Sequence, residues 1–193
     1  LSTNPISVAI PSGINPPIIL DMATTVAAYG KVKTLLQSGG TMPEGWMIDK
    51  NGNPLTDPAK SKDGFLLPIG GPKGYGLALI FGLLAGTLNG GAFGKDVIDF
   101  NADNTTVANT GQFIIALDIE AFMDTEQFKS QIDKIWAEMK SSAKLPGISE
   151  IRLPGENLAK TIKERAASGI KIPEPLFASL AQIADDLSIK RLT

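Results

Sequence analysis

The stretch Gly70–Gly76 places four glycines around Lys73, a composition suited to binding an anion. Glycines let a backbone approach a ligand closely. Lys73 lies near the amino end of an apolar segment with helical character, and the dipole of a helix already favours negative charge there. The stretch therefore suits a phosphate or a carboxylate. The alternative is a flexible turn whose lysine is solvated.

A second candidate group is the carboxylate of Asp21, which precedes the hydroxyls of Thr24 and Thr25. At the end of a strand, such a carboxylate can bind a ribose hydroxyl, or it can cap the next helix by accepting hydrogen bonds from its amides. The two threonines can serve the same ligand or cap the helix themselves. Farther along the chain, Glu156 reads as an acid in the first turn of a helix, where the dipole favours it.

The composition excludes several other chemistries. The 193 residues contain no histidine and no cysteine, which removes a histidine base, a Cys/His zinc site, a thiolate nucleophile and disulfides. No carboxylate pair has a spacing typical of metal or glycoside chemistry, so we expect no metal site. The formal charge of -2 provides no basic field, so nucleic acid is not an expected partner.

Both common nucleotide-binding signatures fail. Gly74-Tyr75-Gly76 begins like G-x-G-x-x-G, but Leu79 occupies the sixth position. The stretch 89–96 resembles a phosphate loop, yet Asn89 replaces the first glycine and Asp96 replaces the Ser/Thr. Neither signature supports a nucleotide site by itself.

The elements that position these groups are indicated by hydrophobic patterning. Alternation predicts a strand over Ile6–Ile10, and Ile18–Leu20 is a second short apolar run that ends at Asp21. Apolar positions at three- and four-residue spacing predict a helix over 24–37 that stops at Gly39. Asp21 is therefore expected at the passage from strand to helix.

The chain between Gly39 and Gly71 is expected to form a long loop or a pair of turns, with Asn51-Gly52 as a hairpin tip and Trp46 as an anchor on the core. The span 74–94 carries no charge, which allows a membrane helix or a buried helix. Because Asn89-Gly90-Gly91 ends the helix short of a full span, we predict a buried helix and no membrane segment.

The second half of the chain is predicted to alternate strands and helices. The predicted strands are 113–119 and 148–153; the predicted helices are one opened by Asp124 and closed near Pro146-Gly147, a second over 156–168 ended by Gly169, and a third over 175–187. The length indicates one domain over 1–193, and the order of elements indicates an α/β or α+β fold with a mixed sheet.

A series of short motifs resembles one enzyme family. The motifs are Thr3-Asn4-Pro5, Asp21-Met22-Ala23-Thr24, Tyr29-Gly30-Lys31, Pro43-Glu44-Gly45-Trp46, Thr56-Asp57-Pro58, Leu67-Pro68-Ile69-Gly70-Gly71-Pro72-Lys73-Gly74 and Leu153-Pro154-Gly155-Glu156. Singly they are weak, but their order and spacing are similar to those of the malate/L-lactate dehydrogenase family, which includes sulfolactate and ureidoglycolate dehydrogenases.

The resemblance implies an NAD- or NADP-dependent oxidoreductase that interconverts a small malate- or lactate-like 2-hydroxy acid and its 2-oxo acid. It implies a mixed, largely antiparallel sheet flanked by helices, in a cofactor-binding fold unrelated to the Rossmann domain. The positions matched to cofactor binding are Asp21, Met22, Ala23, Thr24, Lys73, Pro154, Gly155 and Glu156, and those matched to substrate binding are Thr3, Tyr29, Gly30 and Lys31.

The resemblance also implies a catalytic histidine in an amino-terminal region that precedes the motif at Thr3. Since the sequence holds no histidine, we assign no catalytic residue within it. We expect a cofactor-binding domain with carboxyl-terminal helices that lacks the histidine region and has little activity alone. The expected partner is a second copy, as in the family's usual homodimers, or a companion amino-terminal chain. The alternative is a non-catalytic cofactor-binding or scaffolding protein, and the expected location is the cytoplasm.

Overall fold

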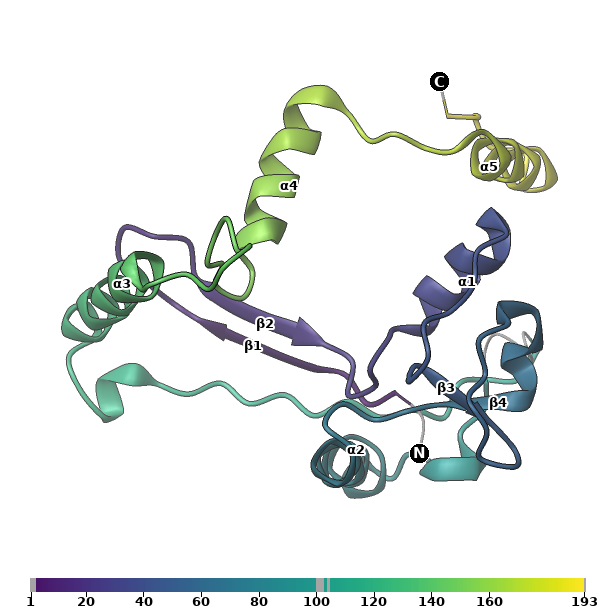
Figure 1. Ribbon diagram of the computed structural model, residues 1–193, viewed down its shortest axis with the longest axis horizontal. Helices are drawn as coiled ribbons and strands as arrows, with labels where there is room; N and C mark the ends of the chain where they lie inside the picture. Colours follow the sequence, from purple (N-terminus) through teal and green to yellow (C-terminus); the bar gives the residue numbers. More distant parts are fainter. Residues whose placement is uncertain (1–2, 100–102, 104, 193) are drawn as a thin grey trace.

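The computed structural model describes residues 3–99, 103 and 105–192. Within these residues, five α-helices and two antiparallel hairpins follow one another around the outline of an open molecule (Figure 1). The fold mixes helices with small antiparallel sheets, as the sequence predicts. Short 3₁₀ helices cover Pro58–Asp63, Thr87–Asn89, Gly94–Asp96 and Ile119–Ala121.

The first hairpin pairs β1 (Ile6–Ile10) with β2 (Ile18–Met22). The predicted strand Ile6–Ile10 is confirmed. The expectation that Asp21 lies between a strand and a helix is wrong, because the ladder continues past it and Asp21 pairs with Ser7 inside β2. Pairing with a partner strand thus extends β2 beyond its apolar run.

Helix α1 (Tyr29–Ser38) begins five residues later than the pattern indicates and ends at Gly39, as predicted, with a left-handed φ of 68°. The later start arises because Thr24 and Thr25 are buried, and Thr25 pairs with Pro68 in an isolated β-bridge. A buried backbone that is already hydrogen-bonded to a neighbouring segment gains nothing by entering the helix.

The second hairpin pairs β3 (Met47–Asp49) with β4 (Gly64–Leu66). The chain turns back after β3 at Asn51-Gly52, where Gly52 has a φ of 86°, so the predicted turn is confirmed. A buried cluster lies between this hairpin and α1, and Trp46 packs against it as expected. Its buried members are Val32, Met42, Met47 and Leu55.

Helix α2 (Pro72–Ala85) follows the glycine-rich turn. Only its small residues, Gly74, Ala78 and Gly82, are buried, and these lie four apart on one face. The prediction of a buried helix is therefore wrong for its large side chains, since Tyr75 and Ile80 are exposed. No helix among the described residues is long and apolar enough to cross a membrane.

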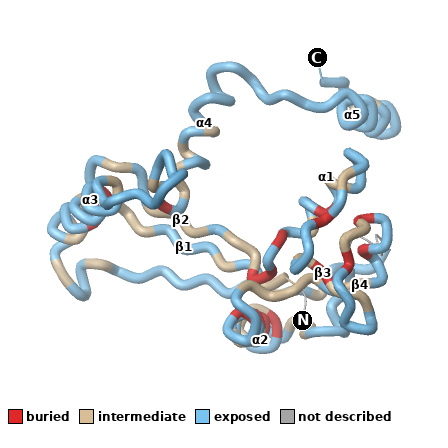
Figure 2. The backbone as a smooth tube through the Cα atoms, viewed as in Figure 1, coloured by how far each residue is buried: buried red, intermediate tan, exposed pale blue. Residues whose placement is uncertain are grey.

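Helix α3 (Thr125–Ser141) begins as predicted, with the carboxylate of Asp124 accepting a hydrogen bond of 2.7 Å from the amide of Gln127. It ends at Ser141, before the predicted stop at Pro146-Gly147. A second buried cluster joins α3 to the first hairpin (Figure 2). Its members are Ile132, Trp136 and Leu153, with Ile10, Ile18 and Phe128 packed against them.

The last two helices agree with the prediction from the sequence. Helix α4 (Glu156–Ser168) has the predicted bounds and ends at Gly169, and α5 (Glu174–Asp186) is displaced by one residue from its prediction. Both helices are largely exposed along their length (Figure 2).

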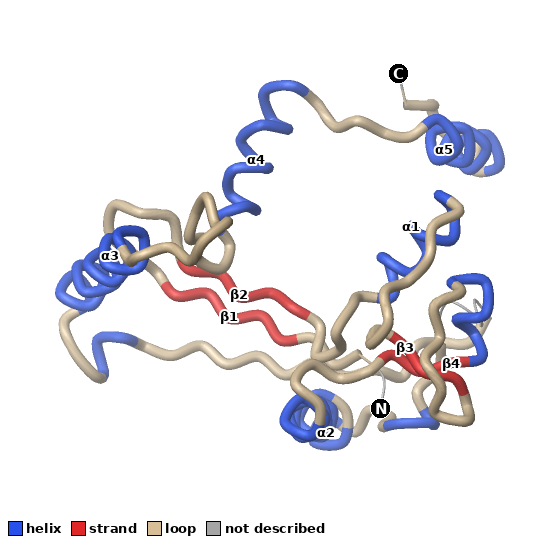
Figure 3. Tube along the Cα trace, in the orientation of Figure 1, coloured by secondary structure: helices blue, strands red, loops and turns tan. Residues whose placement is uncertain are grey.

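Two predicted strands are not formed. The segments 113–119 and 148–153 are loop in Figure 3, apart from the start of a 3₁₀ helix at Ile119. A strand requires a neighbour for its backbone hydrogen bonds, and no described strand pairs with either segment. In the second segment, the carbonyls of Ser149 and Ile151 accept instead from Lys144 and Lys140.

Candidate functional site

The turn at Pro154-Gly155 lies against the outer edge of β2, although more than 130 residues separate them in the chain. The amide of Ile19 donates to the carbonyl of Pro154 at 3.1 Å. Gly155 has a φ of 87°, and a Cβ there would lie 2.9 Å from the Cβ of Ile19. Only glycine combines this left-handed backbone with so close an approach. The structure thus brings two of the predicted cofactor-binding segments into contact.

Glu156 holds this turn in place. Its Oε1 accepts from the ammonium of Lys140 at 2.6 Å, and its Oε2 accepts from the amide of Leu153 at 3.0 Å. The hydrogen bond from Lys140 lowers the pKa of Glu156, and the same pair raises the pKa of Lys140. Both carboxylate oxygens are therefore engaged within the protein.

Asp21 lies two residues beyond Ile19 on β2, and its carboxylate is exposed. The side chains of residues two apart on a strand point to the same face, and their amides point to the same edge in an antiparallel ladder. Since the Ile19 amide donates to Pro154, the amide of Asp21 also points away from β1. Asp21 thus presents a carboxylate and a backbone donor near the turn.

At the other end of β2, the chain is fixed by Thr24, which is completely buried. Its hydroxyl accepts from the amide of Asn4 at 3.2 Å, and its carbonyl accepts from the amide of Ile69 at 3.0 Å. These bonds join three predicted segments: the one at Thr3, the one over 21–24, and the one leading to Lys73. Met22 and Ala23, half-buried, complete the link.

The glycine-rich turn follows Ile69 directly. Gly70 and Gly71 have φ values of 58° and 61°, and a Cβ on either would meet no atom within 4 Å. Gly71 is the N-cap of α2 and no side chain caps this end of the helix. The exposed Lys73 stands in the first turn, which contains no acid. An uncapped helix end beside a lysine and open glycine backbone is suited to an anion.

The predicted cofactor-binding residues therefore gather at two ends of one strand. Pro154 and Gly155 are at the Ile19 end, and the turn before Lys73 is at the Thr24 end. Ile19 to Met22 is extended strand about 10 Å long, and the chain then bends at Thr24. A ligand that touches both ends must be elongated, with its negative charge toward α2.

The residues predicted to border the substrate come from two segments, one before β1 and one at the start of α1. Thr3 is half-buried and adjacent to Asn4, while Gly30 and Lys31 are exposed at the start of α1. The hydroxyl of Tyr29 is 3.2 Å from that of Ser61. The structure thus places Thr3 next to the residue, Asn4, that bonds to Thr24, while Tyr29 is held by the 3₁₀ helix Pro58–Asp63.

Two supporting residues were missed by sequence reasoning. Lys140 holds Glu156, and the buried Ser61 holds Tyr29. Neither has a local signal, because each acts across a tertiary contact. Asn4 was noted only as part of a motif, and its role is carried by a backbone amide that any residue but proline supplies.

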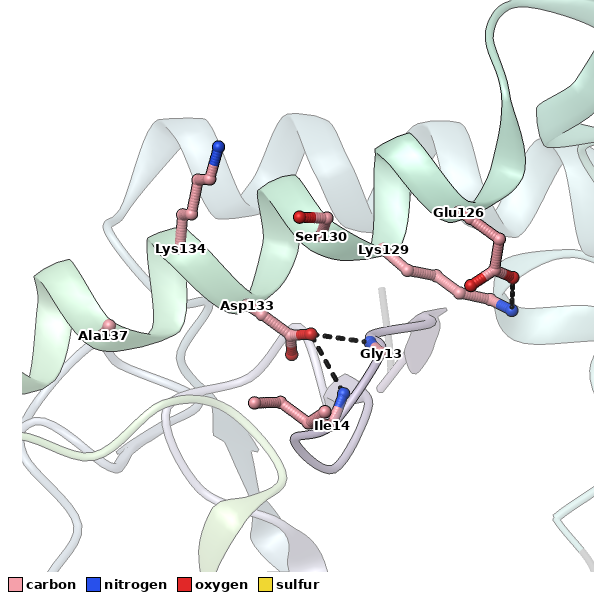
Figure 4. A pocket seen from close by; sticks show the side chains of 8 residues that line it. All are labelled: Gly13, Ile14, Glu126, Lys129, Ser130, Asp133, Lys134 and Ala137. Carbon is pink, nitrogen blue, oxygen red and sulfur yellow. Dashed lines mark hydrogen bonds and ion pairs between the residues drawn. The ribbon is translucent and has the colours of Figure 1, made fainter.

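A groove of about 490 Å³ lies elsewhere, between α3 and the turn that joins β1 to β2 (Figure 4). Asp133 points into this turn and accepts from the amides of Gly13 at 3.1 Å and Ile14 at 2.9 Å. These bonds, led by that of Ile14, lower the pKa of Asp133. Its carboxylate thus clamps the hairpin to α3, and the groove shares no residue with the predicted site. The described residues include no cluster of acidic side chains that could hold a metal ion.

Comparison with known proteins identifies the family. The sequence profile of the malate/L-lactate dehydrogenase family matches residues 1–181. The chain is 37% identical over 190 residues to the malate/(S)-sulfolactate dehydrogenase of Methanothermus fervidus, covering 98% of this chain and 54% of that protein. It is 34% identical over 178 residues to the NAD(+) ureidoglycolate dehydrogenase of Escherichia coli K12, covering 92% and 50%.

Comparison with solved structures gives the same result as the sequence comparison. The sulfolactate dehydrogenase of Methanocaldococcus jannaschii superposes with a TM-score of 0.82 at 36% identity, over 96% of this chain and 53% of that one. The malate dehydrogenase of Entamoeba histolytica superposes with a TM-score of 0.88 at 25% identity, over 96% and 55%. The chain therefore belongs to the malate/L-lactate dehydrogenase family. It spans about half the length of the relatives it matches.

Proposed function

We propose that this chain is the cofactor-binding part of an NAD- or NADP-dependent dehydrogenase that acts on a small malate- or lactate-like 2-hydroxy acid. The observation that supports this most is the convergence on β2 of the Pro154-Gly155 turn at one end and the uncapped, lysine-bearing end of α2 at the other. The names of relatives that act on sulfolactate, malate and ureidoglycolate support the substrate class.

The residues present fit a dinucleotide. The open backbone of Gly70 and Gly71 with the ammonium of Lys73 suits its phosphates, and the exposed carboxylate of Asp21 suits a ribose hydroxyl. Glu156, whose oxygens are both engaged, fixes the shape of the turn rather than offering a free acceptor. Thr3, Gly30 and Lys31 border the space for the oxo acid.

When bound, the nicotinamide supplies the hydride that reduces the oxo carbon. The substrate oxygen then needs a proton from a group that titrates near neutrality. No histidine occurs in the 193 residues, and Lys73 serves the phosphates in this arrangement. We infer that the proton comes from the histidine that the family resemblance implies, in polypeptide outside this sequence, either from a companion amino-terminal chain or from another region of the same protein.

Dinucleotide binding by the chain tests the first part of the proposal. Titration with NADH and NADPH should give saturable binding to one of the two, and Lys73→Ala should weaken it about tenfold because a charge-assisted contact is lost. Lys163→Ala, on the exposed surface of α4, is the matched control and should leave affinity unchanged. Failure of both dinucleotides to bind would contradict the cofactor assignment.

Turnover tests the second part of the proposal, the proton donor outside this sequence. The purified chain should reduce oxaloacetate or pyruvate negligibly, and a histidine-bearing amino-terminal region from a relative should restore turnover when added. A normal enzymatic rate from the 193 residues alone would disprove an external proton donor. Stable assembly without turnover would instead favour a scaffolding role.

A further inference from the structure

The ammonium of Lys140 is bonded to three separate points of the chain that joins α3 to α4. It donates to the carboxylate of Glu156 at 2.6 Å, to the carbonyl of Ile151 at 2.8 Å and to the carboxylate of Glu150 at 3.2 Å. An ammonium has three donors, so all of them are directed to this connection. Lys140 thus ties the last turn of α3 to the segment whose Pro154-Gly155 turn contacts β2 (Figure 1).

The turn itself is closed by a reciprocal pair of hydrogen bonds. The amide of Leu153 donates to Glu156 Oε2 at 3.0 Å, and the amide of Glu156 donates to the carbonyl of Leu153 at 3.2 Å. Since Glu156 Oε1 accepts from Lys140, one carboxylate both closes the turn and fastens it to α3. The position of this carboxylate therefore governs the position of Pro154 and Gly155, which lie between the two bonded residues.

Apolar packing alone does not fix the orientation of the turn. The buried side chain of Leu153 holds the connection against Ile132 and Trp136 of α3. Burial of apolar surface has no preferred direction, whereas hydrogen bonds do. Trp136 and Lys140 are four residues apart and thus lie on the same face of α3. The cluster brings the connection to this face, and the ammonium determines how the turn is presented to β2.

Lys140 also balances negative charge beside the turn. The carboxylates of Glu150 and Glu156 lie 3.2 Å and 2.6 Å from the ammonium. The side chain of Glu156 is only 23% exposed, so water and salt screen its charge incompletely. Without the ammonium, two uncompensated carboxylates would repel an anionic dinucleotide that lies against the turn.

We propose that Lys140 is a positioning residue for the cofactor, which through Glu156 holds the Pro154-Gly155 turn on β2 and so sets the affinity for the dinucleotide. The turn is bonded to β2 at Ile19, whose amide donates to Pro154 at 3.1 Å. Asp21, whose carboxylate suits a ribose hydroxyl, follows two residues later on the same face. Because its three donors are engaged within the chain, Lys140 acts through the turn. This inference rests on the proposed function.

Amide hydrogen exchange tests the positioning in the absence of cofactor. Lys140→Met keeps the apolar stem and removes the three donors, so the amide of Ile19 should exchange about tenfold faster than in the wild-type chain. The amide of Ile69, which donates to Thr24 at the other end of β2, should be unaffected. Unchanged exchange at Ile19, or equal acceleration at Ile69, would overturn the proposal.

Dinucleotide affinity tests the consequence for the site. Under conditions in which each variant is folded, Lys140→Met should weaken binding of NADH or NADPH about tenfold, because a displaced turn no longer fits the ligand. Lys129→Met is the matched control. Lys129 is also on α3, its side chain is 29% exposed against 31% for Lys140, and it forms an ion pair of 2.7 Å with Glu126. It should change neither the affinity nor the exchange at Ile19.

A double variant tests whether Lys140 acts through Glu156. Glu156→Gln should by itself weaken dinucleotide binding about fivefold, and combining it with Lys140→Met should add little to the effect of Lys140→Met alone, because both break the same connection. Multiplication of the two effects would show that Lys140 acts independently of Glu156, and this outcome would disprove the proposed route.

Failure of this inference is distinguishable from failure of the proposed function. If the wild-type chain binds neither dinucleotide, the proposed function fails and with it the cofactor role of Lys140. If the wild-type chain binds one and Lys140→Met binds it equally well, the proposed function stands and the positioning role alone is overturned. If Lys140→Met does not fold, Glu156→Gln takes its place in the exchange experiment, and unchanged exchange at Ile19 would again overturn the inference.

Discussion

The β1–β2 hairpin and the segment Phe113–Leu117 have similar apolar sequences in different environments. β1 and β2 pair with each other, and Ile10 and Ile18 pack against the cluster on α3. Phe113–Leu117 has neither a paired strand nor a covering layer among the described residues. Because propensity for extended structure is alike in both, the difference lies in which neighbours are present. Pairing, rather than propensity, makes a strand here.

The same contrast separates the candidate site from the exposed surfaces. The segments around β2 are tied by specific bonds, including Ile19 to Pro154, Asn4 to Thr24, and Lys140 to Glu156. The site's framework is thus built within this chain, whereas large apolar side chains on separate helices are exposed, among them Ile80 of α2, Ile162 of α4 and Phe177 of α5. The following substitutions test this difference between the bonded framework of the site and the exposed surfaces.

The largest contrast is expected between Ile132→Ala and Ile115→Ala in the isolated chain. Ile132 is buried in the second cluster, so its truncation should lower the free energy of unfolding by about 3 kcal/mol. Ile115 is exposed, and its truncation should cost less than about 0.5 kcal/mol. Urea denaturation measures both values. Equal losses would show that the 113–117 segment is already buried and would break the comparison.

Gly155→Ala should lower the free energy of unfolding by about 2 kcal/mol, through backbone strain and contact with Ile19. Gly39→Ala is a close control, because Gly39 also lies in the left-handed helical region, with a φ of 68°, but has no atom within 4 Å of a built Cβ. It should cost about 1 kcal/mol from strain alone. Equal costs in thermal or urea unfolding would mean that the turn is not held tightly against β2.

Thr24→Val should cost about 1.5 kcal/mol, because the valine removes the buried acceptor of the Asn4 amide without changing the shape of the side chain. Thr34→Val removes an exposed hydroxyl that donates to the carbonyl of Gly30. That control should change the free energy of unfolding by less than about 0.5 kcal/mol. An equally mild effect at Thr24 would show that this junction contributes little to the site's framework.

Glu156→Gln should cost about 1 kcal/mol at neutral pH, since the pair with Lys140 is lost. The folded state lowers the pKa of Glu156 below its ordinary value of 4.5. The stabilisation is therefore present above that ordinary value and is lost as the pH falls through the lowered, folded pKa. The gap between the wild-type and variant unfolding free energies should close over this acidic range.

Glu164→Gln is the matched control for this pH series. Glu164 lies 3.9 Å from Lys160 on the exposed surface of α4, so its replacement should change stability by less than about 0.3 kcal/mol at any pH. A gap for Glu156→Gln that stays constant as the pH falls would show that its effect is not due to the ionised carboxylate.

Local signals in the sequence were sufficient for the start of α3, the end of α4 and the first strand. The capping residue Asp124, the stop at Gly169 and the alternation of Ile6–Ile10 each act through neighbours a few residues away, and each is confirmed. The motif series likewise identified the family. The late start of α1 and the missing strand at 113–119 could not be read from local patterns, because both depend on segments distant in sequence.

The order and type of the residues by themselves determined the family, the candidate ligand-binding positions and the absence of a histidine base. Only the tertiary structure decided that the Gly155 turn lies on β2, that Thr24 links the amino-terminal segment to the turn before Lys73, and that Glu156 is engaged by Lys140. The physical reason is the distance along the chain over which each kind of interaction acts. Caps, turns and periodicity arise from contacts within one or two turns of chain, whereas pairing and burial depend on surfaces that meet only after the chain has folded.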